Sequence, residues 1–278
     1  MKKGEQGEMS FLQHLEELRW HIIRAVLAIM FFAILAFIYD KIIFDYILIA
    51  PRNPSFFTNR MFAHLAEILN SPSIRINDKP FQLINTEMSG QFSTDMWISL
   101  IAGVILAFPF VIWEFWRFVA PALHSKERQN ARFAVLAISG LFFTGVLFGY
   151  YLIAPLSIHF LGTYSVSSQI TNMINLNSYF STIASVSLAS GLIFELPAVA
   201  YFLAKIDVIS TSFLKKYRKH AIIVILIVAA IITPPDVFSQ TLVAIPLYML
   251  FEISILIVAV VQRNKKKAAE TAEQVSQE

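Results

Sequence analysis

Residues 221–261 read AIIVILIVAAIITPPDVFSQTLVAIPLYMLFEISILIVAVV. Two long apolar runs flank a TPPD sequence at residues 233–236, where consecutive prolines cannot easily continue a helix. Runs of this kind are typical of membrane-crossing helices, so the stretch predicts two spans joined by a turn. As a helix, the first run, residues 221–232, covers roughly 18 Å, against about 30 Å for the hydrocarbon core of a bilayer. We therefore expect this span to be short.

The same pattern of apolar runs and polar loops continues through the chain of 278 residues, which is 56% hydrophobic and 15% charged. This composition lies outside the range of soluble domains and predicts an all-α polytopic membrane protein. We expect six transmembrane helices in a single membrane domain, residues 1–262. Their approximate ranges are 25–39, 97–118, 133–155, 179–204, 219–233 and 237–261. The polar tail, residues 263–278, is predicted to be a disordered cytoplasmic segment.

A long stretch outside the membrane, residues 40–95, separates the first two predicted spans. Its apolar residues recur at helical spacing: Phe56, Phe57, Met61, Phe62, Leu65, Ile68 and Leu69. This periodicity indicates an amphipathic helix on the membrane surface. A small packed cap would produce the same pattern, and the sequence favours neither interpretation.

The distribution of Lys and Arg predicts the orientation of the spans. Basic residues gather in the N-terminal segment, in the loops 120–132 and 205–219, and in the tail. The loops 162–177 and 233–240 contain none. Because positive charge favours the cytoplasmic side, both termini are expected there. The basic residues of the long outer stretch fit less well, although long translocated loops follow this rule only weakly.

Two carboxylates fall well inside predicted spans, where an unpaired charge costs several kcal/mol. Glu195 lies two residues before Pro197, which predicts a kink and a polar pocket. It is either a functional intramembrane site or a protonated carboxyl hydrogen-bonded inside the bundle. Glu252 has the same two alternatives, and the hydrogen-bonded carboxyl inside the bundle is the favoured one. Glu114 lies three residues before Arg117, and a local helical ion pair accounts for it.

A second group of carboxylates lies on the predicted cytoplasmic face. Glu16 and Glu17 belong to an amphipathic segment, and Glu127 belongs to the second-to-third loop. Carboxylates on a cationic surface suit a guanidinium ligand, which can donate two parallel N–H bonds to one of them. The competing interpretation is a set of local salt bridges, such as Glu16 with Arg19, and spacing alone favours it.

The sequence argues against an enzyme and against bound cofactors. It contains no nucleophile-elbow, zinc-protease or phosphate-binding motif. No two of its six histidines have the three- or four-residue spacing of helical metal ligands, and cysteine is absent. The net charge of +3 does not suggest nucleic-acid binding. We expect no metal, no cofactor and no nucleic-acid partner.

Four segments together resemble the TatC family, whose members are subunits of the twin-arginine protein translocase. They are HLEELR (residues 14–19), FPFVIWEFWRFVAPALHSKER (108–128), FELP (194–197) and TPPDVFSQTLVAIPLYMLFE (233–252). They occur in the family's order and extend over nearly the whole chain. The last segment is too long and too particular to arise by chance.

The resemblance implies a glove-shaped, concave bundle of six helices with short fifth and sixth spans, in the cytoplasmic (inner) membrane. Members of the family recognise twin-arginine signal peptides at the cytoplasmic face and export folded proteins, and the proton-motive force drives this export. The implied partners are signal peptides of folded cargo, single-span TatA- and TatB-type subunits, the lipid bilayer, and further copies of the chain in the complex.

The resemblance also assigns a signal-peptide site by motif position. Glu17 and Glu127 match the carboxylates that receive the arginine pair, which reverses the preference for local salt bridges at these two residues. Arg19, Phe118 and Pro121 are expected to shape the site.

Three further residues match family positions. Glu195 resembles an intramembrane acid on the concave side, while Pro234 and Asp236 lie in the outer turn between the last two spans. The outer stretch 52–80 looks longer than is usual in the family. An ion-coupled small-solute transporter with Glu195 as proton carrier is the alternative function, but such transporters more often show inverted repeats, and none is visible.

Overall fold

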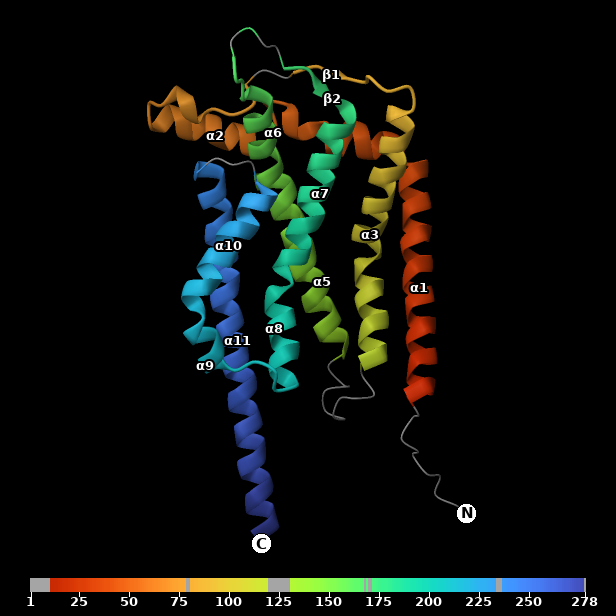
Figure 1. The fold of residues 1–278 in the computed structure, drawn as a ribbon, viewed down its shortest axis with the longest axis vertical. Helices are drawn as coiled ribbons and strands as arrows, with labels where there is room; N and C mark the ends of the chain where they lie inside the picture. Colours follow the sequence, from red (N-terminus) through yellow and green to blue (C-terminus); the bar gives the residue numbers. More distant parts are fainter. Residues whose placement is uncertain are drawn as a thin grey trace. The chain divides into compact units, whose positions relative to one another are not determined.

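The computed structural model describes residues 11–78, 81–119, 131–167, 169, 172–233 and 237–277. The chain is predominantly helical, and its described part contains one pair of two-residue strands (Figure 1). By their internal contacts the residues form two compact units. One unit comprises Met1–Asp40 with Asp95–Gly140, and the other comprises Lys41–Thr94 with Leu141–Glu278.

The first unit is built on the long helices α1 (Phe11–Ile38) and α3 (Gly90–Val119), together with the first half of α5 (Ala131–Phe148). Gly103 lets α1 and α3 approach closely, since a Cβ atom added there would lie 2.7 Å from the backbone nitrogen of Ala33. Small residues at such contacts are typical of helix pairs in lipid, where close packing replaces the hydrophobic driving force.

In the second unit the last part of α5 continues without a break through η5 into α6, and a bundle of helices follows. Its helices are η5 (Gly149–Ile153), α6 (Ala154–Thr163), α7 (Leu176–Phe194), α8 (Leu196–Lys205), α9 (Thr211–Lys216), α10 (Arg218–Ile232) and α11 (Val237–Gln277). The seam between α5, η5 and α7 is made of glycines: Cβ atoms added to Gly145, Gly149 or Gly191 would lie 2.6–2.7 Å from the facing element. These contacts hold the two chain segments together.

The break between α7 and α8 confirms the kink predicted from Pro197. Glu195 is the C-cap of α7, and α8 begins at Leu196 with the proline in its first turn. Proline is tolerated at the start of a helix because the N–H it lacks would have no intrahelical partner there.

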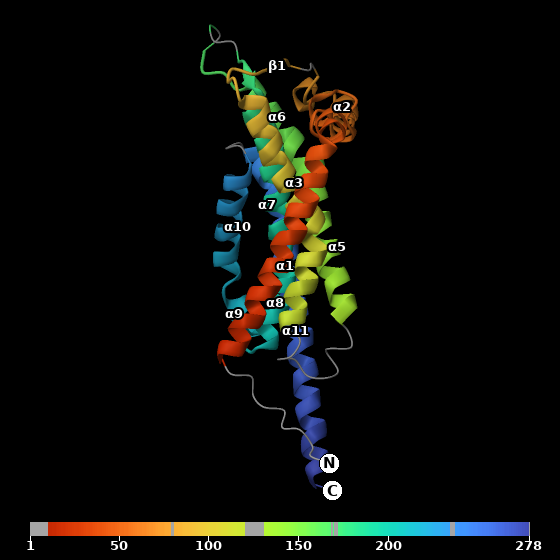
Figure 2. The ribbon, with the colours of Figure 1, turned by 90° about the vertical axis from the view of Figure 1, so that its right-hand side faces the viewer.

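The outer stretch folds into short helices around a small parallel ladder. In order the helices are η1 (Ile42–Leu48), η2 (Ala50–Arg52), α2 (Phe57–Ile68) and η3 (Pro72–Ile74). They are followed by strand β1 (Leu83–Ile84). Strand β1 pairs with β2 (Ile174–Asn175), Leu83 opposite Ile174. Figure 2 looks nearly along α2, while α6 and α7 run up the page, so α2 lies crosswise to both. The predicted helix in this stretch is therefore present.

Within the described residues, five helical segments are long and apolar enough to cross a membrane. They are Leu15–Ile38, Gly90–Val119, Arg132–Thr163, Leu176–Lys205 and Ser239–Lys267. Helix α10 has 15 residues and falls short of them, as the apolar run before the TPPD sequence predicts.

Two expectations about the C-terminal end are wrong. The sixth span is not short, because α11 runs for 41 residues and passes through Pro246. The same helix continues to Gln277 where a disordered tail was expected. The tail is rich in Lys, Ala, Glu and Gln, which favour helix. Lys265 also ties α11 to the end of α8, with its Nζ 2.6 Å from the carbonyl oxygen of Lys205 and 2.7 Å from a carboxylate oxygen of Asp207.

Candidate functional site

One face of α1 carries three polar side chains one turn apart. Glu17, His21 and Arg24 follow the spacing i, i+4, i+7, which places them on the same side of a helix. In the first unit this face meets the last turns of α3, where Glu114 and Arg117 lie.

Glu114 is the centre of this contact. Its side chain is only 3% exposed, and its Oε2 atom lies 2.6 Å from Nδ1 of His21 and 3.5 Å from a guanidinium nitrogen of Arg24. Its other oxygen accepts a hydrogen bond from Arg117 at 3.0 Å, so the predicted helical pair is confirmed. One buried carboxylate thus pairs with two arginines and contacts a histidine; we call these four residues the Glu114 cluster.

The aromatic ring of Phe118 joins the same contact. It meets the ring of His21 edge-on, with centroids 6.1 Å apart. His21 therefore lies between Phe118 on α3 and the turn of α1 that carries Glu17. The structure brings these two expected site residues to one region of the first unit.

Glu17 and its neighbours are open to solvent. Arg19 donates to Glu16 at 3.4 Å, which confirms the local salt bridge predicted from their spacing. Both side chains of that pair are more than half exposed, so it contributes little stability. Glu17 is exposed as well, and within the described residues no ion pair to its carboxylate is observed. The expected site residues Pro121 and Glu127 lie outside the described residues.

Sequence reasoning missed His21 and Arg24 as parts of this region. The available signal was their spacing from Glu17 along α1. The spacing did not reveal the partner, since His21 and Glu114 are 93 residues apart in sequence.

Glu195 is buried in the second unit, where the seam between α5 and α7 ends. Its Oε1 atom is buried without a hydrogen-bond partner in the described residues. The hydroxyl of Ser187, two turns earlier on α7, is also buried and has no hydrogen-bond partner among the residues that the structure describes. A polar strip therefore follows α7 into the apolar core, where unsatisfied polar atoms are costly.

Glu252 has a structural explanation. Its carboxylate accepts hydrogen bonds from Arg218 at 2.6 Å and from the hydroxyl of Tyr248 at 2.8 Å. The Arg218–Glu252 pair links the first turn of α10 to the middle of α11. The role is structural, as the sequence favours, but the carboxylate is held by a partly exposed ion pair and not as a protonated carboxyl inside the bundle. The remaining expected residues, Pro234 and Asp236, lie outside the described residues.

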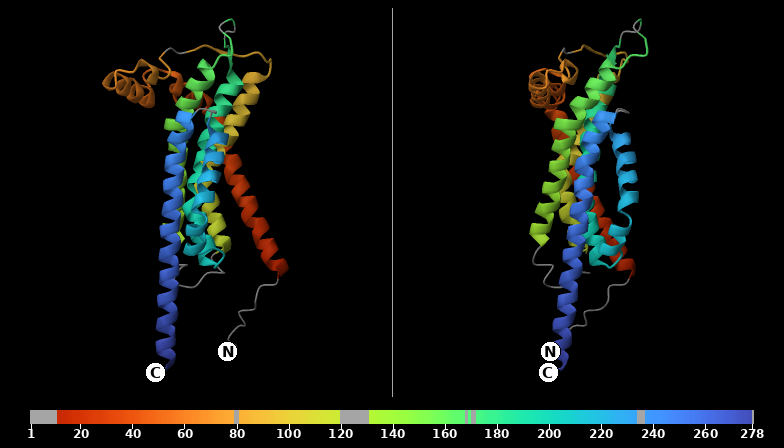
Figure 3. Two further views of the ribbon diagram at one scale, coloured as in Figure 1. Left: turned by 60° about the vertical axis from the view of Figure 1, so that its left-hand side comes forward. Right: turned by 90° about the vertical axis from the view of Figure 1, so that its left-hand side faces the viewer.

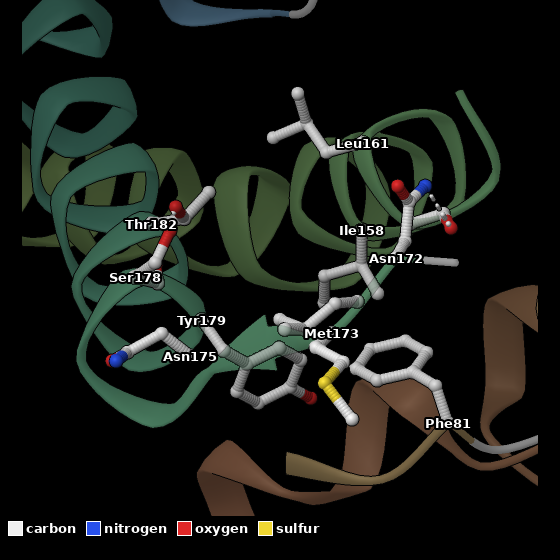
Figure 4. A pocket seen from close by; sticks show the side chains of 11 residues that line it. Phe81, Ile158, Leu161, Asn172, Met173, Asn175, Ser178, Tyr179 and Thr182 are labelled. Atoms are coloured by element: carbon white, nitrogen blue, oxygen red, sulfur yellow. Dashed lines mark hydrogen bonds between the residues drawn. The ribbon is translucent and has the colours of Figure 1, made fainter. Parts of the chain in front are cut away.

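A separate pocket of about 360 Å³ lies where α6, α7 and the strand pair meet in the second unit. Figure 4 shows Phe81, Met173 and Tyr179 along one side and Leu161 on another. Asn172, which donates to the carbonyl of Gly162 at 3.2 Å, closes one edge. Nowhere in the described part of the chain do three His, Asp or Glu side chains gather as a metal site would require.

Residues 13–246 match the family model described as "Sec-independent protein translocase protein (TatC)". The chain belongs to the TatC family. A TatC protein of Blattabacterium is 41% identical over 265 residues, which cover 95% of this chain and all of that protein. A TatC protein of Carboxydothermus hydrogenoformans is 36% identical over 254 residues, covering 91% of this chain and 94% of its own.

A solved structure also matches the TatC fold of this chain. The crystal structure titled "Twin Arginine Translocase Receptor- TatC" superposes with a TM-score of 0.67 at 32% identity, covering 90% of this chain and 99% of that one. As a TatC protein, the chain is a multi-pass component of a protein translocase in the bacterial cell membrane, and not a catalytic enzyme. The alternative of a small-solute transporter is set aside on this basis.

Proposed function

We propose that this TatC protein is the signal-peptide receptor and core subunit of a twin-arginine translocase, with Glu17 as a primary contact for the arginine pair. The observation that carries the proposal is the exposed carboxylate of Glu17, one helical turn from the Glu114 cluster. The similar solved protein is itself titled a twin-arginine translocase receptor.

The Glu114 cluster explains how a cationic ligand can approach a basic surface. Arg24 and Arg117 would repel a second pair of guanidinium groups if they were unpaired. Both are instead paired with the carboxylate of Glu114, whose single negative charge offsets part of their positive charge. Among the described residues no ion pair occupies the carboxylate of Glu17, which can therefore accept a cation.

The preference for arginine over lysine follows from hydrogen-bond geometry. A guanidinium donates two parallel N–H bonds to one carboxylate, whereas an ammonium acts as a point charge. We propose Glu127 as the second acceptor of the arginine pair, with Arg19, Phe118 and Pro121 shaping the site. The ring of Phe118 next to His21 offers an apolar surface for the stem of an arginine side chain.

The membrane topology is part of the same proposal. We count α10 as the fifth of six spans, because its outward side chains are apolar and exposed, as lipid-facing residues are. Its 15 residues cover about 22 Å, so the bilayer must thin or the helix must lie off-centre. Both termini lie in the cytoplasm, following the basic residues. Glu195 lines the concave side of a glove-shaped bundle, and Pro234 and Asp236 form the outer turn.

Translocation then requires partners and an energy source. We propose that single-span TatA- and TatB-type subunits and further copies of this chain assemble with it, and that the proton-motive force drives export of the folded cargo.

An export assay tests this function. Cells that lack their own TatC receive this chain and its compatible single-span subunits, and export of a folded reporter with a twin-arginine signal is measured. We expect export with the wild-type chain and with Glu16→Ala, and loss of export with Glu17→Ala at equal protein level. Export that is unaffected by Glu17→Ala would contradict the assigned site, and no export by the wild-type chain would contradict the function.

A further inference from the structure

Helix α2 in the outer stretch has three distinct faces. Thr58, Asn59, Phe62 and Ala66 are buried against the second unit. Arg60, His64 and Glu67 form an exposed polar face. Between these two faces, four exposed apolar side chains follow the spacing i, i+4, i+8, i+11, and we call them the α2 stripe: Phe57, Met61, Leu65 and Ile68.

The buried face fixes the direction in which the stripe points. The Thr58 hydroxyl donates to the carbonyl oxygen of Tyr151 in η5. The Asn59 amide donates to the carbonyl oxygens of Pro51 at 2.9 Å and Asn53 at 2.8 Å. Phe62 packs with Ile76 and Leu156. A helix held this way by its buried face leaves the adjoining stripe exposed unless something else covers it.

The stripe is continuous with the outer surface of a membrane-crossing helix. The ring of Phe57, 60% exposed, meets the ring of Tyr151 edge-on with centroids 6.4 Å apart. Tyr151 is itself partly exposed, and Leu147, one turn earlier on α5, is exposed as well. These two residues belong to the apolar segment Arg132–Thr163. Lipid that covers Leu147 and Tyr151 therefore also reaches Phe57.

We propose that the α2 stripe docks on the lipid bilayer and that this contact sets the edge of the membrane at η5. Apolar side chains beside the polar side chains of Arg60 and His64 form the pattern of a helix that lies in the interface, with the Arg60 cation at headgroup level. Tyrosines are favoured at the same depth, where Tyr150 and Tyr151 lie.

The length of the helical segment that contains η5 supports a membrane edge at η5. The segment Arg132–Thr163 has 32 residues, or about 48 Å of helix, which is much longer than the roughly 30 Å of hydrocarbon. From Arg132 to Tyr151 the helix covers about 28 Å, which matches the hydrocarbon thickness. Helix α6, which follows η5, then lies outside the hydrocarbon. Figures 1 and 3 show α2 beside α6, at the same end of the second unit.

The contacts of α6 suit a position outside the hydrocarbon. Nδ1 of His159 accepts from the backbone N–H of Asn77 at 3.2 Å. The Asn77 amide donates to the carbonyl of Pro155 at 3.0 Å and to Asn59 at 3.2 Å. The pocket near Leu161 is on the same side of η5 and includes several polar side chains (Figure 4).

Spin labels on single cysteines test the proposal, and the chain has no cysteine of its own. The full-length protein is labelled at Met61→Cys, Ile68→Cys or His64→Cys and placed in phosphatidylethanolamine–phosphatidylglycerol vesicles. Collision with oxygen, which concentrates in lipid, is compared with collision with a water-soluble nickel complex. We expect the Met61 and Ile68 labels to collide mainly with oxygen, and the His64 label mainly with nickel.

A matched pair on one helical segment tests the boundary. Leu147 and Leu161 are the same residue type and are 54% and 53% exposed. We expect a Leu147→Cys label in lipid and a Leu161→Cys label in water. Equal nickel accessibility at Met61, Ile68 and His64 would overturn the docking, and so would shielding of the stripe from both agents, which would indicate a protein partner. A Leu161 label as deep as the Leu147 label would overturn the boundary. If either Met61→Cys or Ile68→Cys does not fold, the label at the other position tests the docking by itself.

Discussion

Nδ1 of His21 on α1 lies 2.6 Å from Oε2 of Glu114 on α3. This contact ties the helix that carries Glu17 to the helix that carries Phe118. Because Glu114 also pairs with Arg24 and Arg117, the cluster both joins the helices and offsets positive charge near the proposed receptor site.

Glu114→Ala should weaken both stability and signal-peptide binding. It leaves two arginines without their carboxylate, at a cost of about 1–2 kcal/mol, because both arginines are half exposed and partly solvated. Thermal unfolding in detergent and peptide titration measure the two effects. Glu16→Ala is the control, since its exposed pair contributes under about 1 kcal/mol. Equal effects of the two substitutions would show that the cluster has no special role.

Gly145→Ala should destabilise the second unit. An added Cβ atom would lie 2.6 Å from the carbonyl oxygen of Ser190 and 2.7 Å from the Phe194 side chain, so helices α5 and α7 must separate. We expect a loss of about 1–3 kcal/mol, typical of overpacking. Gly140→Ala, on the same helix, has open space and should stabilise by roughly 0.5–1 kcal/mol. Unfolding temperatures of the two variants, measured side by side, should move in opposite directions.

Asn77→Ala should cost more than Asn70→Ala, although both residues have left-handed backbones with φ of 51° and 49°. The shared conformational cost is about 1 kcal/mol. Asn77 is also buried and donates to Asn59 and Pro155, so its loss leaves buried acceptors unsatisfied and adds about 1–3 kcal/mol. Denaturation curves give both values; similar losses would mean that the Asn77 hydrogen bonds contribute little.

Arg218→Ala should loosen α10 from α11. The substitution removes the 2.6 Å contact with Glu252, at a cost of about 1 kcal/mol, since the pair is partly exposed. Lys219→Ala changes the next residue, for which no ion pair is recorded in the described part of the chain, and should leave stability unchanged. Limited proteolysis and thermal unfolding would compare the two. A loss of the same size in both variants would refute the role of the Arg218–Glu252 pair.

Local patterns in the sequence predicted much of the fold. The Pro197 kink, the short α10 and the helix in the outer stretch each depend on a few neighbouring residues and are present. The pairs Glu16–Arg19 and Glu114–Arg117 follow from three-residue spacing in the same way.

Contacts between distant segments were not predictable. The approach of His21 to Glu114 and of Thr58 to Tyr151 each joins residues 93 positions apart, and neither side chain shows its partner in its own sequence context. Helix α11 is longer than the sequence predicts. Its tail is polar enough to suggest disorder, and the Lys265 contacts that tie it to the end of α8 join residues about 60 positions apart, so only the structure shows them.

The most direct test of the receptor proposal is the affinity of the purified protein for a twin-arginine signal peptide. The same peptide with Lys-Lys, and the variants Glu17→Ala, Glu127→Ala and Glu16→Ala, complete the comparison. We predict that affinity falls at least about tenfold, or 1.4 kcal/mol, for the Lys-Lys peptide and for Glu17→Ala and Glu127→Ala. Glu16→Ala should bind like the wild type. Equal affinity across all combinations would contradict the account.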